Sequence, residues 1–157
     1  MILLEKIEKI KDFLQSERKG LLITGTHQCK KHWLIMSLLN HYYKDCAVLY
    51  RISYLNNITM KDFTPLNKTP KAGQGVRMGN NWNYFDAMHS INSWDKTANK
   101  KYDFAIVYPL DGLTRKKGVD VIEELLRCRS IGKVFLCSCV LVTIMILASF
   151  QNTTQTI

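Results

Sequence analysis

Acidic residues are scarce in this chain: 13 Asp and Glu stand against 22 Lys and Arg in 157 residues, which gives a formal net charge of +9. An excess of positive charge favours anionic partners such as nucleic acids, nucleotides or acidic membranes, and charge alone does not select among them. The content of 46% hydrophobic and 22% charged residues is that of an ordinary globular protein. We therefore expect residues 1–157 to form a single domain.

The chain also lacks the cysteine patterns that indicate disulfides or structural zinc. Five Cys is an odd number, and the first residues do not show the basic-then-apolar order of a secretory signal. We therefore expect free thiols and a cytoplasmic location. His27, Cys29 and His32 are metal-ligand residue types, but no second ligand pair follows them, so we favour free thiols over a zinc site. A nucleophilic pair of Cys29 with His32 or His89 has no orienting carboxylate in view.

Helical and strand patterns alternate along the chain. Apolar residues recur every three or four positions over residues 2–17, which predicts an amphipathic helix. Short apolar runs predict strands, and further periodic stretches predict helices: strands over 21–24, 46–53, 104–108 and 133–138, helices over 31–43, 82–94 and 117–129. This alternation predicts a three-layer α/β fold, with a mostly parallel sheet of about four to five strands flanked by helices.

The region from about 56 to 81 has no clear period and is predicted to be a mobile basic insertion. It contains four cationic candidates for nucleic-acid contacts: Lys61, Lys68, Lys71 and Arg77. Aromatic residues follow it at Trp82 and Tyr84 and could stack on bases, although their spacing favours helix and core packing. A nucleic-acid-binding accessory protein is therefore an alternative hypothesis for this chain.

Residues 134–150 are uncharged and approach the shortest length that spans a bilayer. A cationic region precedes them and an uncharged tail follows, as in a tail-anchored protein. Burial as a strand over 133–138 that continues into a buried fifth element is the favoured interpretation, because that strand is needed to complete the sheet. A tail-anchored, membrane-associated adaptor is the second alternative.

The segment 21–32 predicts a strand, a turn and a helix start, with Gly25 and Lys31 at the spacing of a phosphate-binding loop. In an intact loop a second Gly precedes the Lys, and a Ser or Thr hydroxyl that holds Mg²⁺ follows it. Here Lys30 stands at the position of the second Gly, and His32 stands at that of the hydroxyl. The loop keeps an anion-binding outline and has lost a metal ligand.

Residues 102–113 resemble the second motif of P-loop ATPases of the AAA-like class, in which an apolar strand ends in an acidic pair. Tyr108 and Pro109 occupy the acidic positions, and Asp111 lies beyond them. Residues 134–138 resemble the next strand of that family, which commonly ends in a small polar residue, here Ser138. The resemblance covers about 18–139 and rests on the order of elements.

The resemblance implies a degenerate P-loop ATPase-like domain that acts as a non-hydrolysing nucleotide- or anion-binding or regulatory module. Its implied ligand is ATP or another phosphate-containing molecule bound without Mg²⁺, and its implied partner is an active ATPase or a nucleic-acid enzyme. The candidate ligand contacts are Gly25, Lys30, Lys31, His32 and Asp111. Because the metal-binding hydroxyl and acid are missing, we expect no efficient ATP hydrolysis. A further hypothesis is an active enzyme, namely a small sulfo- or phosphotransferase that uses a P-loop-like site with altered residues.

Overall fold

A seven-stranded sheet forms the centre of the protein in the computed structural model, which describes residues 2–25, 31–59, 63–110, 115–138 and 154–157. The elements in chain order are α1 (Ile2–Gln15), β1 (Gly20–Ile23), α2 (Lys31–Tyr42), β2 (Ala47–Ile52), the short 3-10 helix η1 (Leu55–Thr59), β3 (Val76–Met78), β4 (Asn81–Ala87), α3 (Ile91–Asp95), β5 (Tyr102–Tyr108), α4 (Arg115–Arg127), β6 (Ile131–Cys137) and β7 (Thr154–Thr156).

The strands lie in the order β3-β4-β2-β5-β6-β1-β7. All neighbouring pairs are parallel except β3 with β4. β1 therefore lies between β6 and β7, and β6 separates it from β5. The carboxyl ends of the parallel strands meet at one edge of the sheet, which is where open α/β sheets place their ligands.

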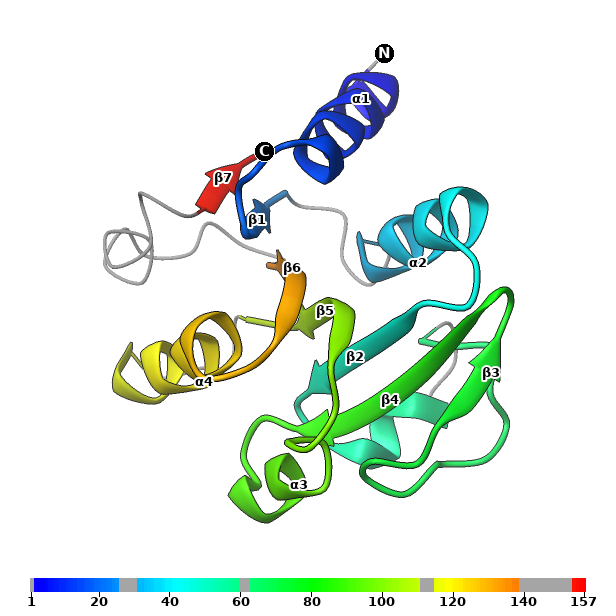
Figure 1. Cartoon of the computed structure of the whole chain (residues 1–157), viewed down its shortest axis with the longest axis vertical. Helices are drawn as coiled ribbons and strands as arrows, with labels where there is room; N and C mark the ends of the chain where they lie inside the picture. The colour runs from blue at the N-terminus through cyan, green and yellow to red at the C-terminus, as the bar shows by residue number, and fades with distance from the viewer. Residues whose placement is uncertain (1, 26–30, 60–62, 111–114, 139–153) are drawn as a thin grey trace.

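Helices cover both faces of the sheet (Figure 1). On one face, Ile10 and Phe13 of α1 and Ile35 of α2 are buried against side chains of the central strands. On the other face, Ile122 and Leu125 of α4 are fully buried against the sheet. The predicted three-layer α/β class with a mostly parallel sheet is confirmed. The sheet is larger than the expected four to five strands, because β3, β4 and β7 were not predicted.

The predicted helix over 82–94 is wrong. Residues 81–87 form strand β4, and only Ile91–Asp95 is helical. The aromatic residues recur near a helical period, but the segment pairs with β2 on one side and with β3 on the other. Ladder hydrogen bonds on both edges outweigh a weak local preference for helix. The region predicted as an insertion contains η1 and β3.

The predicted apolar segment 134–150 is described only in part. Its first residues belong to β6 and are buried, as expected for a strand that completes the sheet. Residues 139–150 lie outside the described residues. Of the helices that the structure describes, none has the length and apolar character needed to cross a bilayer.

Candidate functional site

β1 leads into a turn at Thr24 and Gly25, at the edge of the sheet formed by the strand ends. Gly25 has φ +142°, a backbone conformation that a side chain would strain. Lys31, the first residue of α2, is only 8% exposed and donates from Nζ to the Gly25 carbonyl oxygen at 3.0 Å. The predicted pair of Gly25 and Lys31 is thus brought together. Lys30 lies outside the described residues.

A second lysine reaches the same turn from α1. Lys6 donates from Nζ to the Thr24 carbonyl oxygen at 3.0 Å. A Cβ atom built on Gly25 would lie 3.6 Å from Lys6 Nζ and 3.6 Å from Lys31 Cε, so both side chains flank the same α-carbon. We call Lys6, Thr24, Gly25 and Lys31 the Gly25 turn. Sequence reasoning missed Lys6, because it precedes Thr24 by 18 positions and lies on a different element.

His32 follows Lys31 and is 1% exposed. Its Nε2 lies 2.7 Å from the Phe63 carbonyl oxygen, which only accepts, so Nε2 carries the proton. Nδ1 is then an acceptor, and among the residues that the structure describes this buried atom has no hydrogen-bond partner. Burial lowers the pKa of His32 below its ordinary value, and the bond to Phe63 opposes that shift less strongly. His32 is therefore a neutral imidazole at neutral pH.

Three rings pack together where α2 begins and β5 ends. The His32 ring centroid lies 4.6 Å from that of Phe63 and 4.7 Å from that of Tyr108. Phe63 and Tyr108 are themselves 5.7 Å apart. We call His32, Phe63 and Tyr108 the ring cluster. Asp111, the acidic candidate of the same strand end, lies outside the described residues.

Backbone hydrogen bonds fix the neighbouring strand ends. Ser138 N donates to Ile23 O at 3.0 Å, and Leu110 N donates to Cys137 O at 3.1 Å. The ends of β1, β6 and β5 are therefore tied side by side, which holds the Gly25 turn and the ring cluster at one edge of the sheet. Ser138 is fully buried there.

A second polar group, which sequence reasoning also missed, lies under α3 and α4. Arg51 of β2 is fully buried and donates to both Asp86 carboxylate oxygens at 2.9 Å and to Glu124 at 2.6 Å. Thr97 donates to Asp86 at 2.8 Å, and Arg129 binds Thr97 and Glu124. We call these five residues the Arg51 network. Its two arginines and two carboxylates balance in charge. The feature of the sequence that could have indicated this network is an arginine within an otherwise apolar strand.

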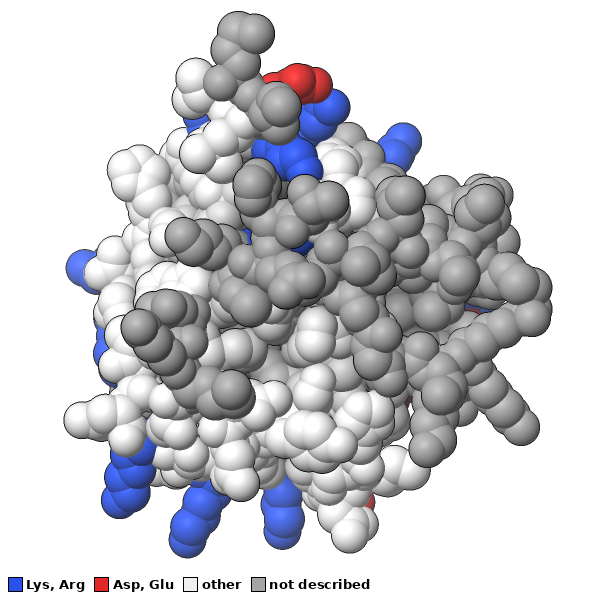
Figure 2. All heavy atoms as spheres, turned by 180° about the vertical axis from the view of Figure 1, so that it is seen from behind, with Lys and Arg blue, Asp and Glu red and all other residues white. Residues whose placement is uncertain are grey.

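Of the cationic candidates of the predicted insertion, Arg77 lies on β3, which four strands separate from β1 in the sheet. Lys68 and Lys71 are exposed, and Lys61 lies outside the described residues. Arg77 of β3 pairs with Asp45 at 2.7 Å, and its guanidinium carbon lies 5.4 Å from the centroid of the Trp82 ring. Figure 2 shows long basic side chains projecting from the lower end of the molecule, where Figure 1 places α3 and the loops around β3.

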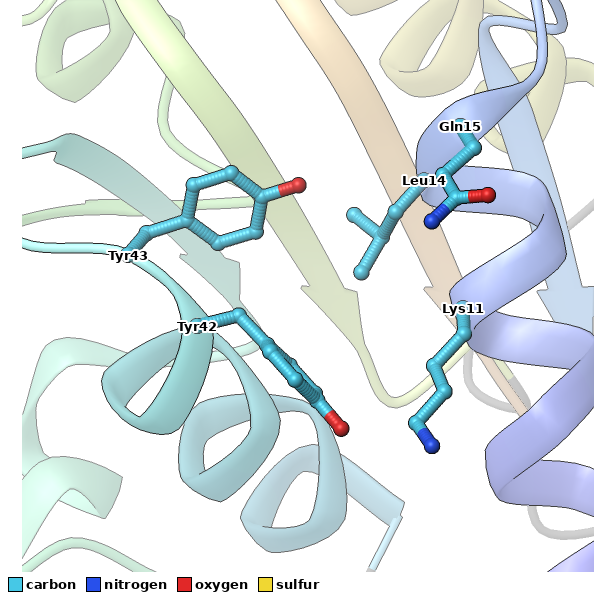
Figure 3. A pocket seen from close by; sticks show the side chains of 5 residues that line it. All are labelled: Lys11, Leu14, Gln15, Tyr42 and Tyr43. Carbon is cyan, nitrogen blue, oxygen red and sulfur yellow. The ribbon is translucent and has the colours of Figure 1, made fainter.

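A cavity of about 430 Å³ lies between α1 and α2 (Figure 3). Its lining residues are Lys11, Leu14, Gln15, Tyr42 and Tyr43. Tyr42 and Tyr43 lie at the end of α2 and directly after it, whereas the Gly25 turn lies at its beginning. Lys11 is already bonded to Glu8 at 2.7 Å and lies 5.8 Å from the centroid of the Tyr42 ring. The cavity is therefore separate from the predicted anion site.

Metal and thiol candidates add no further site in the described part of the chain. There, no three His, Cys, Asp or Glu side chains come together in a way that could hold a metal ion. Cys46, Cys128 and Cys137 form no disulfide in the described structure. His27 and Cys29 lie outside the described residues. No protein family, curated protein or solved structure matches this chain.

Proposed function

We propose that this protein is a phosphate-binding module built on a degenerate P-loop ATPase-like scaffold, and that it binds its ligand without hydrolysing it. The main observation that supports this proposal is the contact between His32 and Tyr108, whose ring centroids lie 4.7 Å apart. In the family that the sequence resembles, the hydroxyl and the acid at these two positions hold one Mg²⁺ together. The proximity of His32 and Tyr108 in this fold supports the correspondence of these two residues to the metal-binding positions of the two family motifs.

The strand order is a second, independent support. β1 precedes the Gly25 turn, β5 ends at Tyr108, and β6 lies between these two strands. One strand between the two motif strands is the arrangement of AAA-like P-loop ATPases. The two supports are separate, because the order concerns backbone pairing and the ring contact concerns side chains.

The chemistry of the ring cluster favours binding without hydrolysis. Phosphoryl transfer in P-loop enzymes relies on Mg²⁺ held by a hydroxyl and a carboxylate. Here a neutral imidazole and a phenol occupy those positions, with the Phe63 ring packed against both. Lys31 and the amides at the start of α2 supply positive potential for an anion. Lys31 Nζ, now on the Gly25 carbonyl, would turn toward the bound phosphate.

The test is equilibrium dialysis of the full chain with radiolabelled ATP, in Mg²⁺ and in EDTA. We expect similar affinity in both, no turnover, and a loss of at least about tenfold in Lys31→Gln, the effect of one charged hydrogen bond. Lys44→Gln, which removes an exposed lysine, is the matched control. A thermal melt of each variant separates lost binding from lost folding. Mg²⁺-dependent binding with turnover that Lys31→Gln abolishes would overturn the proposal, as would no binding by the wild type.

A second candidate function, binding of single-stranded nucleic acid, is favoured by the finding that residues 81–87 form a strand and not a helix. In a strand, Trp82 and Tyr84 point to the same face, and Trp82 is 43% exposed. Arg77 lies over Trp82, and the Lys100 ammonium lies 4.6 Å from the centroid of the Tyr84 ring. Cations beside accessible aromatic rings suit bases that stack and phosphates that follow them.

Fluorescence anisotropy with labelled single-stranded DNA and RNA tests this candidate. We expect affinity to fall steeply with salt, and Trp82→Ala to weaken binding about tenfold, the contribution of one stacked base. Tyr54→Ala is the control, because Tyr54 is 62% exposed and follows the opposite end of β2. Absence of binding at low salt would exclude this candidate and leave the phosphate-binding proposal untouched. The protein partner implied by the family resemblance stays a proposal for either function.

A further inference from the structure

The position of Lys6 is fixed by packing that does not involve the Gly25 turn. One turn further along α1, Ile10 is 1% exposed, and Phe13 is fully buried with its ring centroid 5.4 Å from that of Phe135. Lys133 of β6 donates to the carbonyl oxygens of Ser16 and Arg18, which ties down the segment after the helix. α1 is therefore anchored at its far end. The packing of α1 therefore places Lys6 beside Thr24.

Two ammonium groups thus bind consecutive carbonyl oxygens of one turn. Lys6 donates to Thr24 O and Lys31 donates to Gly25 O, each at 3.0 Å. An ammonium has three donors, so Lys6 keeps two after this bond, and in the described part of the chain it makes no salt bridge. Carbonyl dipoles offset a positive charge only in part. Two like charges beside one α-carbon favour an anion between them.

The second lysine also supplies positive charge that a bound Mg²⁺ would otherwise provide to neutralise a phosphate. In P-loop enzymes Mg²⁺ and one lysine together neutralise the terminal phosphates. Without the groups that hold Mg²⁺, Lys31 alone would face a terminal phosphate that carries nearly two negative charges. Lys6 supplies the missing positive charge from outside the loop.

We propose that Lys6 and Lys31 together form a metal-independent site for a dianionic tetrahedral oxyanion, namely the phosphate group of a nucleotide or of a smaller phosphate compound. This inference deepens the proposed function and rests on it. It adds a ligand-binding residue on α1 and a preference for two negative charges. Lys6 is predicted to discriminate between dianions and monoanions of the same shape.

The test measures binding to the full chain in EDTA by isothermal titration calorimetry. The charge probes are sulfate, a dianion, and methanesulfonate, a monoanion with similar sulfonate oxygens. We expect the wild type to prefer sulfate, and Lys6→Gln to weaken sulfate binding by about tenfold or more while affecting methanesulfonate less. Lys6→Arg should restore the preference. Lys9→Gln, on the same helix and paired with Glu5, is the control with an equal loss of charge and should change affinity less than about twofold.

ATP and pyrophosphate, also in EDTA, identify the source of the phosphate. Comparable affinities assign recognition to the phosphate groups, and tighter ATP binding assigns it to a nucleotide; in both cases Lys6→Gln must weaken binding. Wild-type affinity in Lys6→Gln, with binding lost in Lys31→Gln, overturns this inference and leaves the proposed function standing. Equal losses for sulfate and methanesulfonate in Lys6→Gln also overturn it, because they indicate a loosened turn. No binding of any probe to the wild type removes the proposed function itself.

Discussion

The Arg51 network and the Gly25 turn are both polar groups beside the same sheet, and they differ in how completely their members are paired. In the Arg51 network, every buried donor and acceptor meets another side chain or a carbonyl: Arg51 alone bonds Asp86, Glu124 and the Val121 carbonyl. Its guanidinium carbon also lies 4.1 Å from the centroid of the Trp94 ring. A buried network satisfied in this way has nothing left to offer a ligand.

The edge with the Gly25 turn is organised differently. His32 Nδ1 is buried without a hydrogen-bond partner in the described structure, and the Lys6 ammonium donates to a backbone carbonyl. Such unsatisfied or partly satisfied groups reduce stability and are retained mainly where they serve a function. This contrast indicates that the Arg51 network, the buried charged cluster of the described structure, is structural. The less complete one is the better candidate for binding.

The largest expected effect tests the structural assignment of the Arg51 network. Arg51→Met removes the partner of two Asp86 oxygens and leaves that carboxylate buried. We expect a loss of about 3–5 kcal/mol in the free energy of unfolding, as for other buried ion pairs with one partner removed. Urea unfolding followed by circular dichroism measures it. A loss below about 1 kcal/mol would contradict the description of the network as a stabilising unit.

Thr97→Val tests the centre of the same network with little change in shape. The Thr97 hydroxyl donates to Asp86 and accepts from Arg129 Nη1 at 2.7 Å, so valine leaves both groups short of a partner. We expect a loss of about 1–3 kcal/mol in the free energy of unfolding. Thr59→Val is the matched control, because Thr59 is exposed and bonds only the Asn56 carbonyl in the described structure. Equal effects at both positions would show that the buried Thr97 hydroxyl contributes no more to stability than an exposed one.

The pH dependence of stability probes the other region, through His32. Its pKa is lowered in the folded state, so below about pH 6.5 the unfolded chain binds a proton that the folded chain does not. Stability therefore falls as pH falls, by at most about 1.4 kcal/mol per pH unit from this group, until the lowered folded-state pKa is reached. We expect His32→Phe to show a flatter profile in urea unfolding between about pH 7.5 and 5.5.

The control for this profile is His89→Phe, because His89 is exposed. Carboxylates also titrate toward acid pH, and they contribute equally to both variants. Only the difference between the His32 variant and the wild type reports on the ring cluster. Identical slopes for these two proteins would mean that folding does not lower the pKa of His32, which would remove the contrast between the two regions.

The sequence predicted the central strands well and the contacts between them poorly. The strands predicted over 21–24, 46–53, 104–108 and 133–138 are confirmed within two residues at each end, because strands buried on both faces are short apolar runs. β4 was missed, because Asn81, Asn83 and Asp86 interrupt its apolar pattern. In the fold these three side chains are buried, and each bonds to a residue of another element, namely Asn40, Val76 and Arg51 respectively.

The candidate site was predictable where its residues are close in sequence. Gly25 and Lys31 belong to one local pattern, and the structure brings them together. Lys6 and Phe63 reach the same region from α1 and from the segment after η1, 18 positions from Thr24 and 31 positions from His32. No local period encodes such contacts, because they follow from the strand order and the docking of α1. Arg51 was visible in the sequence, but its partner Asp86 was assigned to a helix.

The smallest expected effect completes the comparison, with the same substitution used at Arg51. Arg127 of α4 pairs with Glu123 at 3.4 Å, and their side chains are 64% and 37% exposed. Arg127→Met should lower the free energy of unfolding by no more than about 0.5 kcal/mol, because exposed pairs spaced by four residues in a helix contribute little and are screened by salt. Urea unfolding at low and high salt measures the effect. A loss close to that of Arg51→Met would mean that burial does not set the strength of ion pairs in this protein.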